Sequence, residues 1–465
     1  MGLPSDGDPP ATAGGTDNQR RMTNSKQRIF VQRCIAPECR AEYNLDDRLY
    51  VCSRCGGLLD IERVEDFAAD AASSLRDLWL KRRISADARD RSGVWRFREF
   101  LPFDDDTAVV SLQEGNTPLY DAPRSAGYCR LPHLRLKHQG CNPTGSFKDT
   151  GMTVAVTQAR KLAARIVVCA STGNTAASLA AYAARADLLC AIIVPGGQVS
   201  HAKLAQALDY GAKVLEIDGN FDACMNAVRD LSEDDSVYLV NSINPFRIEG
   251  QKIVAFELAE QLGWQAPDHL VVPGGNLGNS SAFGKGFREL LRSGLLERQP
   301  KITVVQAAGA APFARFYTGA SRSTFINEEH PKTLASAIKI GAPVSWQKAG
   351  RAVKETGGSV ITVTEQEIAD AKAVIGRDGI GCEPASATTV AGIRKLVNDG
   401  FIKEDENVVA VLTGHLLKDT DYVMKYHNQE LVTPDRERIV STFGNSPVRV
   451  SASREIMAKL LDDLE

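Results

Sequence analysis

Short runs of β-branched and other apolar residues alternate with amphipathic helical patterns from Leu131 to about Thr413. This alternation limits the fold more than any other feature of the chain. The apolar runs predict strands at 165–170, 189–194, 213–217, 237–240, 269–272, 302–306 and 408–413. Uninterrupted apolar runs are typical of strands buried on both faces, and the helices between them supply right-handed crossovers. The predicted fold class is therefore α/β, with open, doubly wound parallel sheets.

Several unusual loops stand where these predicted strands end. Ser171–Thr175, Gly274–Asn279 and Thr413–His415 each follow a strand, and Asn142–Lys148 precedes a helical pattern. In open α/β sheets, ligands bind at the carboxyl ends of the strands, where such loops meet. We expect the four loops to form one site.

Lys148 is the candidate nucleophile in these loops. Pro143 and Gly145 predict a tight turn, and Lys148 follows where a helix should begin. An amine beside a helix N-terminus and other cationic or desolvating groups can have a lowered pKa and act as a nucleophile. Taken alone, Lys148 also fits a solvated lysine at the start of a helix, so the neighbouring motifs decide between the two interpretations.

The loop that runs from Pro273 to Asn279 is rich in glycine and directly follows a predicted buried strand. Its glycines let the backbone approach a ligand and turn several N–H groups toward one point, next to a helix that begins near Ser280. This combination predicts a phosphate site, although an ordinary tight turn remains an alternative. No Lys-Ser/Thr pair closes the loop, so it is not a Walker A motif.

Two further loops offer neutral polar groups. The hydroxyls, amide and free N–H groups of Ser171–Thr175 suit a carboxylate. Thr413 would place a hydroxyl at the sheet edge, where it would leave a pyridine nitrogen less protonated than a carboxylate would.

Four of the ten cysteines form a cluster near the N-terminus. Cys34 and Cys39 make one pair, and Cys52 and Cys55 make a second pair followed by two glycines. Two such pairs predict a zinc ribbon in which four thiolates close a structural site, with metal-free thiols as the alternative. We expect the scattered cysteines to be buried and reduced: Cys129, Cys141, Cys169, Cys190, Cys224 and Cys382.

Composition excludes some partners. The chain has 55 basic and 58 acidic residues and a formal net charge of −3, which gives no reason to expect nucleic acid or an anionic membrane as a partner. The stretch at 1–27 lacks a secretory signal pattern and is predicted to be disordered, with a transit peptide as the weaker interpretation. A cytoplasmic location is the expectation. The charged stretch from about Glu62 to Arg98 is predicted to be helical.

Together with Glu114–Leu119, these motifs resemble the signature set of fold-type II pyridoxal-phosphate (PLP) enzymes, and in particular the threonine synthase family. Asn241–Gln251 and Ala335–Gly341 are similar to segments of its plant-like branch. The resemblance implies two doubly wound open sheets, a homodimer, and a catalytic region at 63–465 that follows a ribbon at 28–62. A smaller sub-domain at about 150–255 would be inserted in a larger domain.

The resemblance also implies a role for each matching residue. Lys148 would form the Schiff base with PLP, Asn174 would bind its phenolic oxygen, and Thr413 would face its ring nitrogen. The cofactor phosphate would be held by Gly275, Asn276, Leu277, Gly278 and Asn279. The substrate would be bound by Ser171, Thr172, Thr175, Ser242 and Arg247. His415 and Glu383 are expected to line or brace the site, without a role in proton transfer.

The implied reaction converts O-phospho-L-homoserine and water to L-threonine and phosphate by γ-elimination and β-addition. Two other enzymes of the same fold remain alternatives: cysteate synthase, which uses O-phosphoserine and sulfite, and a threonine/serine dehydratase. A dehydratase needs no Ser242–Arg247 phosphate site. A non-catalytic protein acting through its ribbon is the third class, and the joint presence of Lys148, Asn174 and Thr413 argues against it.

Overall fold

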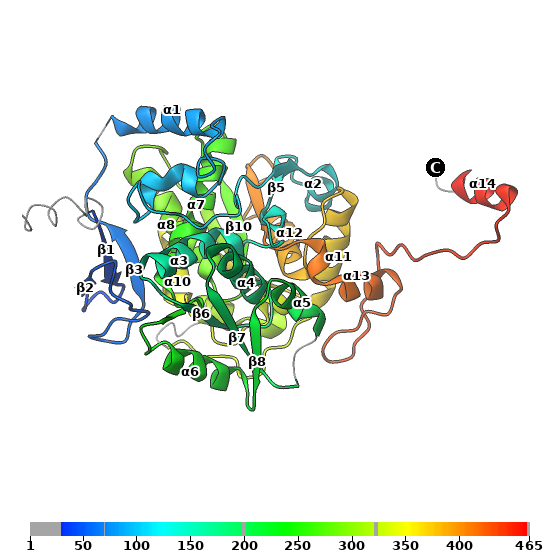
Figure 1. Cartoon of the computed structure of the whole chain (residues 1–465). Helices are drawn as coiled ribbons and strands as arrows, with labels where there is room; N and C mark the ends of the chain where they lie inside the picture. The colour runs from blue at the N-terminus through cyan, green and yellow to red at the C-terminus, as the bar shows by residue number, and fades with distance from the viewer. Residues whose placement is uncertain (1–28, 69, 198–200, 320–323, 463–465) are drawn as a thin grey trace, which may run out of the picture.

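The computed structural model describes residues 29–462, except for 69, 198–200 and 320–323. The predicted disordered stretch at 1–27 lies outside the described residues. Two parallel-rich sheets, a small N-terminal sheet and the helices packed on them make up the described part of the chain (Figure 1).

The larger sheet has six strands in the order β12-β11-β10-β13-β5-β4. All neighbouring strands are parallel except the edge strand β4, which is antiparallel to β5. The strands of this sheet are β4 (Leu119–Asp121), β5 (Leu134–His138), β10 (His269–Pro273), β11 (Lys301–Ala307), β12 (Val360–Val363) and β13 (Val408–Leu412). Its central strands β10 and β13 are buried along their whole length, as their apolar runs predict.

The second sheet has four parallel strands in the order β8-β7-β6-β9. These strands are β6 (Ile166–Ala170), β7 (Leu189–Pro195), β8 (Lys213–Ile217) and β9 (Val237–Leu239). In the sequence they all fall between β5 and β10, so the chain leaves the larger sheet, builds the smaller one and returns. This arrangement confirms the predicted fold class of two open parallel sheets.

Helices cover the sheets and fill the space between them (Figure 1). Those that follow or connect the strands are α2 (Pro123–Cys129), α3 (Lys148–Lys161), α4 (Asn174–Ala186), α5 (His201–Asp209), α6 (Phe221–Leu231), α7 (Pro245–Gln261), α8 (Gly278–Arg292), α9 (Pro312–Thr318), α10 (Trp346–Thr356), α11 (Glu365–Arg377) and α12 (Pro384–Asn398). Helix α7 is buried from Pro245 to Ala259 and packs on α3 and α8, which makes it the centre of the molecule. Within the described residues, no helix has both the length and the apolar character needed to cross a bilayer.

The C-terminal segment leaves the body of the molecule. Helix α13 (Thr420–His427) packs near α11, and the chain then runs outward to α14 (Arg454–Asp462), which lies away from the other helices in Figure 1.

The N-terminal sheet has the order β2-β1-β3 and is antiparallel, with β1 at Phe30–Cys34, β2 at Glu42–Tyr43 and β3 at Leu59–Arg63. The predicted helix from Glu62 to Arg98 is wrong over most of its length. Glu62 and Arg63 pair with β1, and only α1 (Ala71–Arg83) and the short 3-10 helix η2 (Trp95–Phe100) are helical. Between these two helices, residues 88–94 form turns. Gly93 packs closely on Gly115 in these turns, and a Cβ on Gly93 would lie 2.2 Å from the nitrogen of Asn116.

Buried ion pairs connect the N-terminal sheet to helices of the main body of the molecule. Asp60 on β3 lies 3.4 Å from the amine of Lys285 on α8 and 3.5 Å from that of Lys348 on α10. Lys285 also lies 2.5 Å from Glu249 of the central helix α7, and Glu249 pairs with Lys252 at 2.6 Å. The network thus joins β3 to three helices.

Candidate active site

Helix α3 begins at Lys148, and two sets of hydrogen bonds fix the loop before it. The N–H of Phe147 donates to the carbonyl of Thr413 at 2.9 Å, which places the loop against the end of β13. The buried carboxylate of Asp149 accepts from the N–H and hydroxyl of Thr144 at 2.7 and 2.6 Å and from the Ser178 hydroxyl at 2.5 Å. Lys148 is therefore held in place by both of its neighbours in the sequence.

The amine of Lys148 is a weak base for a lysine. Burial and the positive charge of Arg247 lower the pKa of the amine, the carboxylate of Glu383 opposes both effects, and together they leave the pKa at about 7. Lys148 keeps part of its surface exposed, so a ligand can reach it. At neutral pH a large fraction of this amine is unprotonated and can act as a nucleophile or a base.

Arg247 is a buried cation that forms no ion pair with a carboxylate of the described residues. Its side chain lies on the first turns of α7 and is 3% exposed, and burial lowers its pKa to about 10. One guanidinium N–H donates to the carbonyl of Val240 at 3.2 Å, and the buried Nε has no hydrogen-bond partner among the described residues. Two cations that repel each other in a buried place, Lys148 and Arg247, make this region a binding site for an anion.

The glycine loop follows β10 and leads into α8, which begins at Gly278. Leu277 caps this helix in the left-handed conformation, with a φ of 64°, and offers no side-chain cap. No backbone carbonyl in the described part of the chain accepts the N–H groups of 275–280, although Ser281 begins the helical pattern by donating to Leu277. A Cβ on Gly274 would lie 2.7 Å from Gln306 and Val304, so only glycine fits there.

Helix α7 lies between the glycine loop and Lys148. A Cβ on Gly151, one turn after Lys148, would lie 2.8 Å from the carbonyl of Arg247 and 2.9 Å from the amide of Gln251. The side-chain oxygen of the same Gln251 lies 3.4 Å from the position that a Cβ on Gly278 would take. The free N–H groups at the start of α8 therefore lie close to the first turns of both α3 and α7.

The loops of the smaller sheet meet in the same way. The side chain of Asn241 exchanges two hydrogen bonds of 3.0 Å with the backbone of Ala170. This contact fixes Ser171 and Ser242, the next residue in each segment, as neighbours. Both side chains are partly exposed, as are those of Thr172 and Thr175, so their hydroxyls are available to a ligand.

Thr413 and Asn174 are connected by a residue to which the sequence assigned only a bracing role. The buried carboxylate of Glu383 accepts from the hydroxyl of Thr413 at 2.8 Å and from the amide of Asn174 at 2.9 Å. Burial raises the pKa of Glu383. A Cβ on Gly414 would lie 2.3 Å from this carboxyl group, so the contact needs the glycine. The sequence offers one signal for the position of Glu383: it directly precedes Pro384, the first residue of α12, and so lies at a helix N-terminus.

The structure thus brings the predicted loops together. Lys148, the 275–279 loop and Arg247 meet around α7, and Asn174 and Thr413 meet at Glu383. One cysteine expectation is wrong: Cys141 is exposed, while the other five scattered cysteines are buried. Cys141 ends the short 3-10 helix Gln139–Cys141 and belongs to none of the apolar core clusters.

The four N-terminal cysteines lie together, with all sulfur atoms within 4.8 Å of one another. Cys34 and Cys55 are 3.4 Å apart, and Cys39 and Cys52 are 3.7 Å apart. A tetrahedral zinc ion with bonds of about 2.3 Å needs sulfur separations of roughly 3.8 Å, so the quartet fits this metal. A Cβ on Gly57, two residues after Cys55, would lie 3.2 Å from the sulfur of Cys34, so a larger residue there would crowd the quartet.

The residues around Lys148 fit pyridoxal phosphate. The cofactor needs an unprotonated amine for its aldehyde, N–H donors for its phosphate and polar groups around its ring. The amine is that of Lys148, and the N–H donors are those at the start of α8. The polar groups for the ring are Asn174, Glu383 and Thr413.

Comparison with known proteins agrees with this chemistry. Residues 110–414 match the family model described as a pyridoxal-phosphate dependent enzyme. The chain is 41% identical to the threonine synthase of Methanocaldococcus jannaschii, over 94% of this chain and 100% of that one. It is 46% identical to the threonine synthase of Methanosarcina acetivorans, over 85% of this chain and 94% of that one.

Solved structures share the fold. Threonine synthase from Escherichia coli superposes with a TM-score of 0.62 at 16% identity, covering 94% of this chain and 100% of that one. A fungal L-serine ammonia-lyase from Rhizomucor miehei gives a TM-score of 0.58 at 18% identity, covering 68% of this chain and 99% of that one. The identities with these two threonine synthases cover 85% or more of the chain, and the chain belongs to the threonine synthase family of pyridoxal-phosphate-dependent enzymes.

Proposed function

We propose that this enzyme converts O-phospho-L-homoserine and water to L-threonine and phosphate. The observation that carries the proposal is the buried guanidinium of Arg247, which forms no ion pair within the described residues, beside the weakly basic amine of Lys148. A substrate with both an amino-acid end and a phosphate needs an amine site and a separate anion site. A guanidinium is well shaped for the phosphate dianion.

Each proposed role rests on the position of the residue. The N–H groups of Gly275, Asn276, Leu277, Gly278 and Asn279 would hold the cofactor phosphate, because no backbone carbonyl of the described residues accepts them. Ser242 and Arg247 would hold the substrate phosphate. Ser171, Thr172 and Thr175 would take the substrate carboxylate and part of its phosphate.

Lys148 would carry the cofactor between turnovers and move protons at the substrate carbons during each turnover. When bound, pyridoxal phosphate supplies an electron-withdrawing ring that stabilises negative charge at the substrate Cα. The amine of Lys148, with its pKa near 7, is suited to take the Cα proton and to return it. Asn174 and Thr413 would face the phenolic oxygen and the ring nitrogen, and Glu383 would position both.

Cysteate synthase is the second candidate, because the Arg247 site would also accept O-phosphoserine. A dehydratase is disfavoured, because its substrate carries no phosphate to pair with this guanidinium. Membership of the plant-like branch, a homodimeric state and a cytoplasmic location remain part of the proposal, and the first two rest on the sequence resemblance.

The test is phosphate release by the purified holoenzyme. We expect release from O-phosphohomoserine, with L-threonine as the second product, and none from O-phosphoserine with sulfite. Arg247→Gln should raise KM for O-phosphohomoserine by about 10- to 100-fold, since it removes hydrogen bonds between charged groups. The visible absorbance of the bound cofactor should not change.

Arg315→Gln serves as the control, because Arg315 is an exposed arginine that pairs with Glu328 at 2.8 Å. Its kinetics should match those of the parent enzyme. Absence of threonine formation would refute the proposed reaction, and an unchanged KM in Arg247→Gln would refute the proposed phosphate site.

A further inference from the structure

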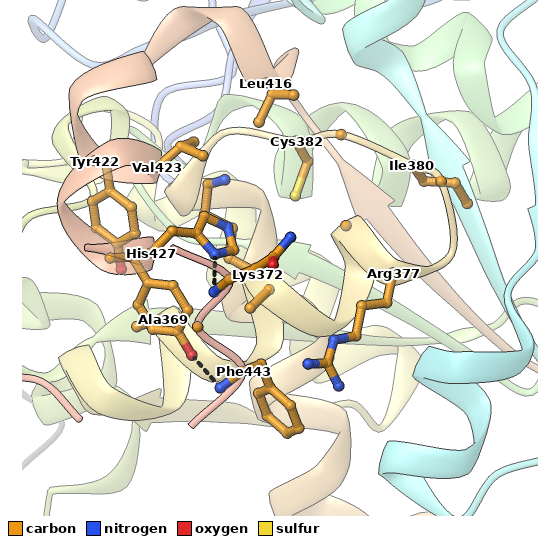
Figure 2. A pocket seen from close by; sticks show the side chains of 17 residues that line it. Ala369, Lys372, Arg377, Ile380, Cys382, Leu416, Tyr422, Val423, His427 and Phe443 are labelled. Atoms are coloured by element: carbon orange, nitrogen blue, oxygen red, sulfur yellow. Dashed lines mark hydrogen bonds between the residues drawn. The ribbon is translucent and has the colours of Figure 1, made fainter. Parts of the chain in front are cut away.

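A second cavity lies behind the group formed by Asn174, Glu383 and Thr413. It has a volume of about 470 Å³ and lies between α11, α13, the 379–382 loop and the 443–445 segment (Figure 2). Such a volume is within the range of pockets that bind small molecules. None of the residues assigned above to cofactor, substrate or metal lines this cavity.

The ionisable nitrogen groups in its lining are all basic. Lys372, Arg377 and His427 line the cavity, and no aspartate or glutamate does. Lys372 is only 8% exposed, and burial lowers its pKa, while Cys382 and Asp419 oppose this effect. Among the described residues, neither Lys372 nor Arg377 forms an ion pair with a carboxylate. A largely buried ammonium group without an ion-pair partner is costly, and a bound anion would stabilise it.

His427 adds a directed donor. Its Nδ1 accepts a hydrogen bond of 3.1 Å from the N–H of Asn445, so the hydrogen of the neutral ring is on Nε2. Burial lowers the pKa of His427, and the charges of Lys372 and Arg377 lower it further. The ring is thus a neutral N–H donor beside two cations.

The remaining walls include aromatic rings. Tyr422, Tyr426 and Phe443 line the cavity, and the guanidinium of Arg377 stacks on the Phe443 ring at 4.8 Å. The hydroxyl of Tyr426 accepts from the N–H of Phe443 at 3.2 Å, one of the bonds drawn in Figure 2. The hydroxyl of Tyr422 is buried and has no hydrogen-bond partner within the described residues. A planar ring would fit between such walls, and its anionic group would reach the cations.

The cavity shares a wall with the candidate active site. Cys382 and Leu416 line it, and they are adjacent in sequence to Glu383 and His415. Cys382 and His415 form an antiparallel bridge, and the N–H of Glu383 donates to Gly414 at 3.0 Å. A ligand that displaces this wall would therefore move the carboxylate that binds Thr413 and Asn174.

We propose that this cavity is a second binding site for a small aromatic anion, held through its phosphate or carboxylate by Lys372, Arg377 and His427. The proposal does not depend on which phosphorylated amino acid is the substrate. Occupancy changes the environment of the cofactor through Glu383.

Phenyl phosphate is the probe, because it combines a ring with an anion. Calorimetric titration of the holoenzyme should show one such ligand bound per chain in the Arg247→Gln variant, in which the substrate phosphate site is removed. In this background, Lys372→Gln and Arg377→Gln should each weaken binding by about 10-fold. Ala373→Leu, which fills the cavity without changing its charge, should abolish binding. The cofactor absorbance should shift on saturation of the Arg247→Gln enzyme.

The control is Arg63→Gln, because Arg63 stacks on the Phe67 ring at 3.9 Å in a distant part of the chain and should leave binding unchanged. Thermal unfolding of each variant separates lost binding from lost folding. Equal affinity in Lys372→Gln, or loss of binding with Arg247→Gln alone, would overturn the second site. Equal affinity for inorganic phosphate would overturn the aromatic part of the proposal. An absorbance spectrum that stays constant at saturation would overturn the link to the cofactor.

Discussion

At the scale of single residues, the chemistry of the site follows from charges that lack partners. Lys148 and Arg247 are close enough for the charge of one to lower the pKa of the other, and neither forms an ion pair within the described residues. Both are positioned by neighbours that do have partners, such as Asp149 with Thr144 and Ser178. The folded protein therefore holds two poorly solvated cations in place, and ligand anions stabilise this arrangement.

The lowered pKa of Lys148 predicts how cofactor uptake depends on pH. Only the unprotonated amine attacks an aldehyde, and the pKa is about 7 where a free lysine has about 10.5. The rate of pyridoxal-phosphate uptake by the apoenzyme should therefore rise with pH, reach half of its maximum near pH 7 and level off at higher pH. Stopped-flow absorbance measures this rate, and the reaction of the cofactor with a free lysine derivative corrects for ionisation of the cofactor itself. A rate that still rises steeply above pH 9 would contradict the prediction.

At the scale of elements, the N-terminal sheet is bound to the catalytic region through charged groups. Burial acts to raise the pKa of Asp60, but the amines of Lys285 and Lys348 outweigh this effect and lower it. These amines belong to α8, which begins at the glycine loop, and α10. The network therefore connects the position of β3 to the helix that presents the N–H groups of the cofactor site.

Asp60→Asn should destabilise the enzyme by about 3 to 5 kcal/mol, because it leaves the buried amine of Lys348 without its carboxylate and removes one carboxylate from Lys285. Since the folded-state pKa of Asp60 lies below its unfolded value, its contribution is present above pH ~4 and is lost as pH falls through the folded-state pKa. Urea unfolding at neutral and acidic pH measures both effects. Asp66→Asn, which breaks an exposed pair with Arg292, should change stability by less than about 0.5 kcal/mol. Equal effects of the two variants would refute the structural role of Asp60.

The cysteine quartet predicts a structural zinc ion. The parent enzyme should contain about one zinc per chain by mass spectrometry, and Cys55→Ser should lose most of it. The unfolding temperature of this variant should fall, because the free energy of metal binding is part of the free energy of folding. Its kcat should change less than about twofold below that temperature, since four thiolates leave no open position for a substrate. Cys141→Ser removes an exposed cysteine outside the ribbon and should keep the zinc; zinc loss in both variants would contradict this assignment.

At the scale of the whole molecule, the site is assembled from both large sheets. Ser171 and Ser242 follow strands of the smaller sheet, while the glycine loop and Thr413 follow strands of the larger one. Helix α7 packs against α3 and α8 and so connects the two groups of loops. A ligand that contacts both groups will tie the two sheets together.

Hydrogen exchange tests this division of the site. Addition of pyridoxal phosphate, L-threonine and inorganic phosphate to the apoenzyme should slow exchange at 171–175 and 274–280 together, because the cofactor phosphate would bind the second loop and the product carboxylate the first. Helix α1, which lies outside the site, should exchange at an unchanged rate. Protection of one loop without the other would show that the site does not span the two sheets.

The local sequence determined the elements and most of the candidate site. Buried strands, the helix that begins at Lys148, the glycine loop and the cysteine quartet all have signals within a few residues, because strand burial, turn geometry and metal-ligand spacing are local properties. The charged stretch at 62–98 was predicted wrongly as a helix. Its first residues, Glu62 and Arg63, form a strand instead, because they pair with β1.

Only the tertiary structure decided which charges meet. The pairing of Asp60 with Lys285, the meeting of Asn174 and Thr413 at Glu383, and the cationic lining of the second cavity join residues that lie far apart in the sequence. The pKa of Lys148 likewise depends on packing and on Arg247, nearly a hundred positions away. Electrostatic interactions depend on distance and burial in space, and the sequence order alone contains neither quantity.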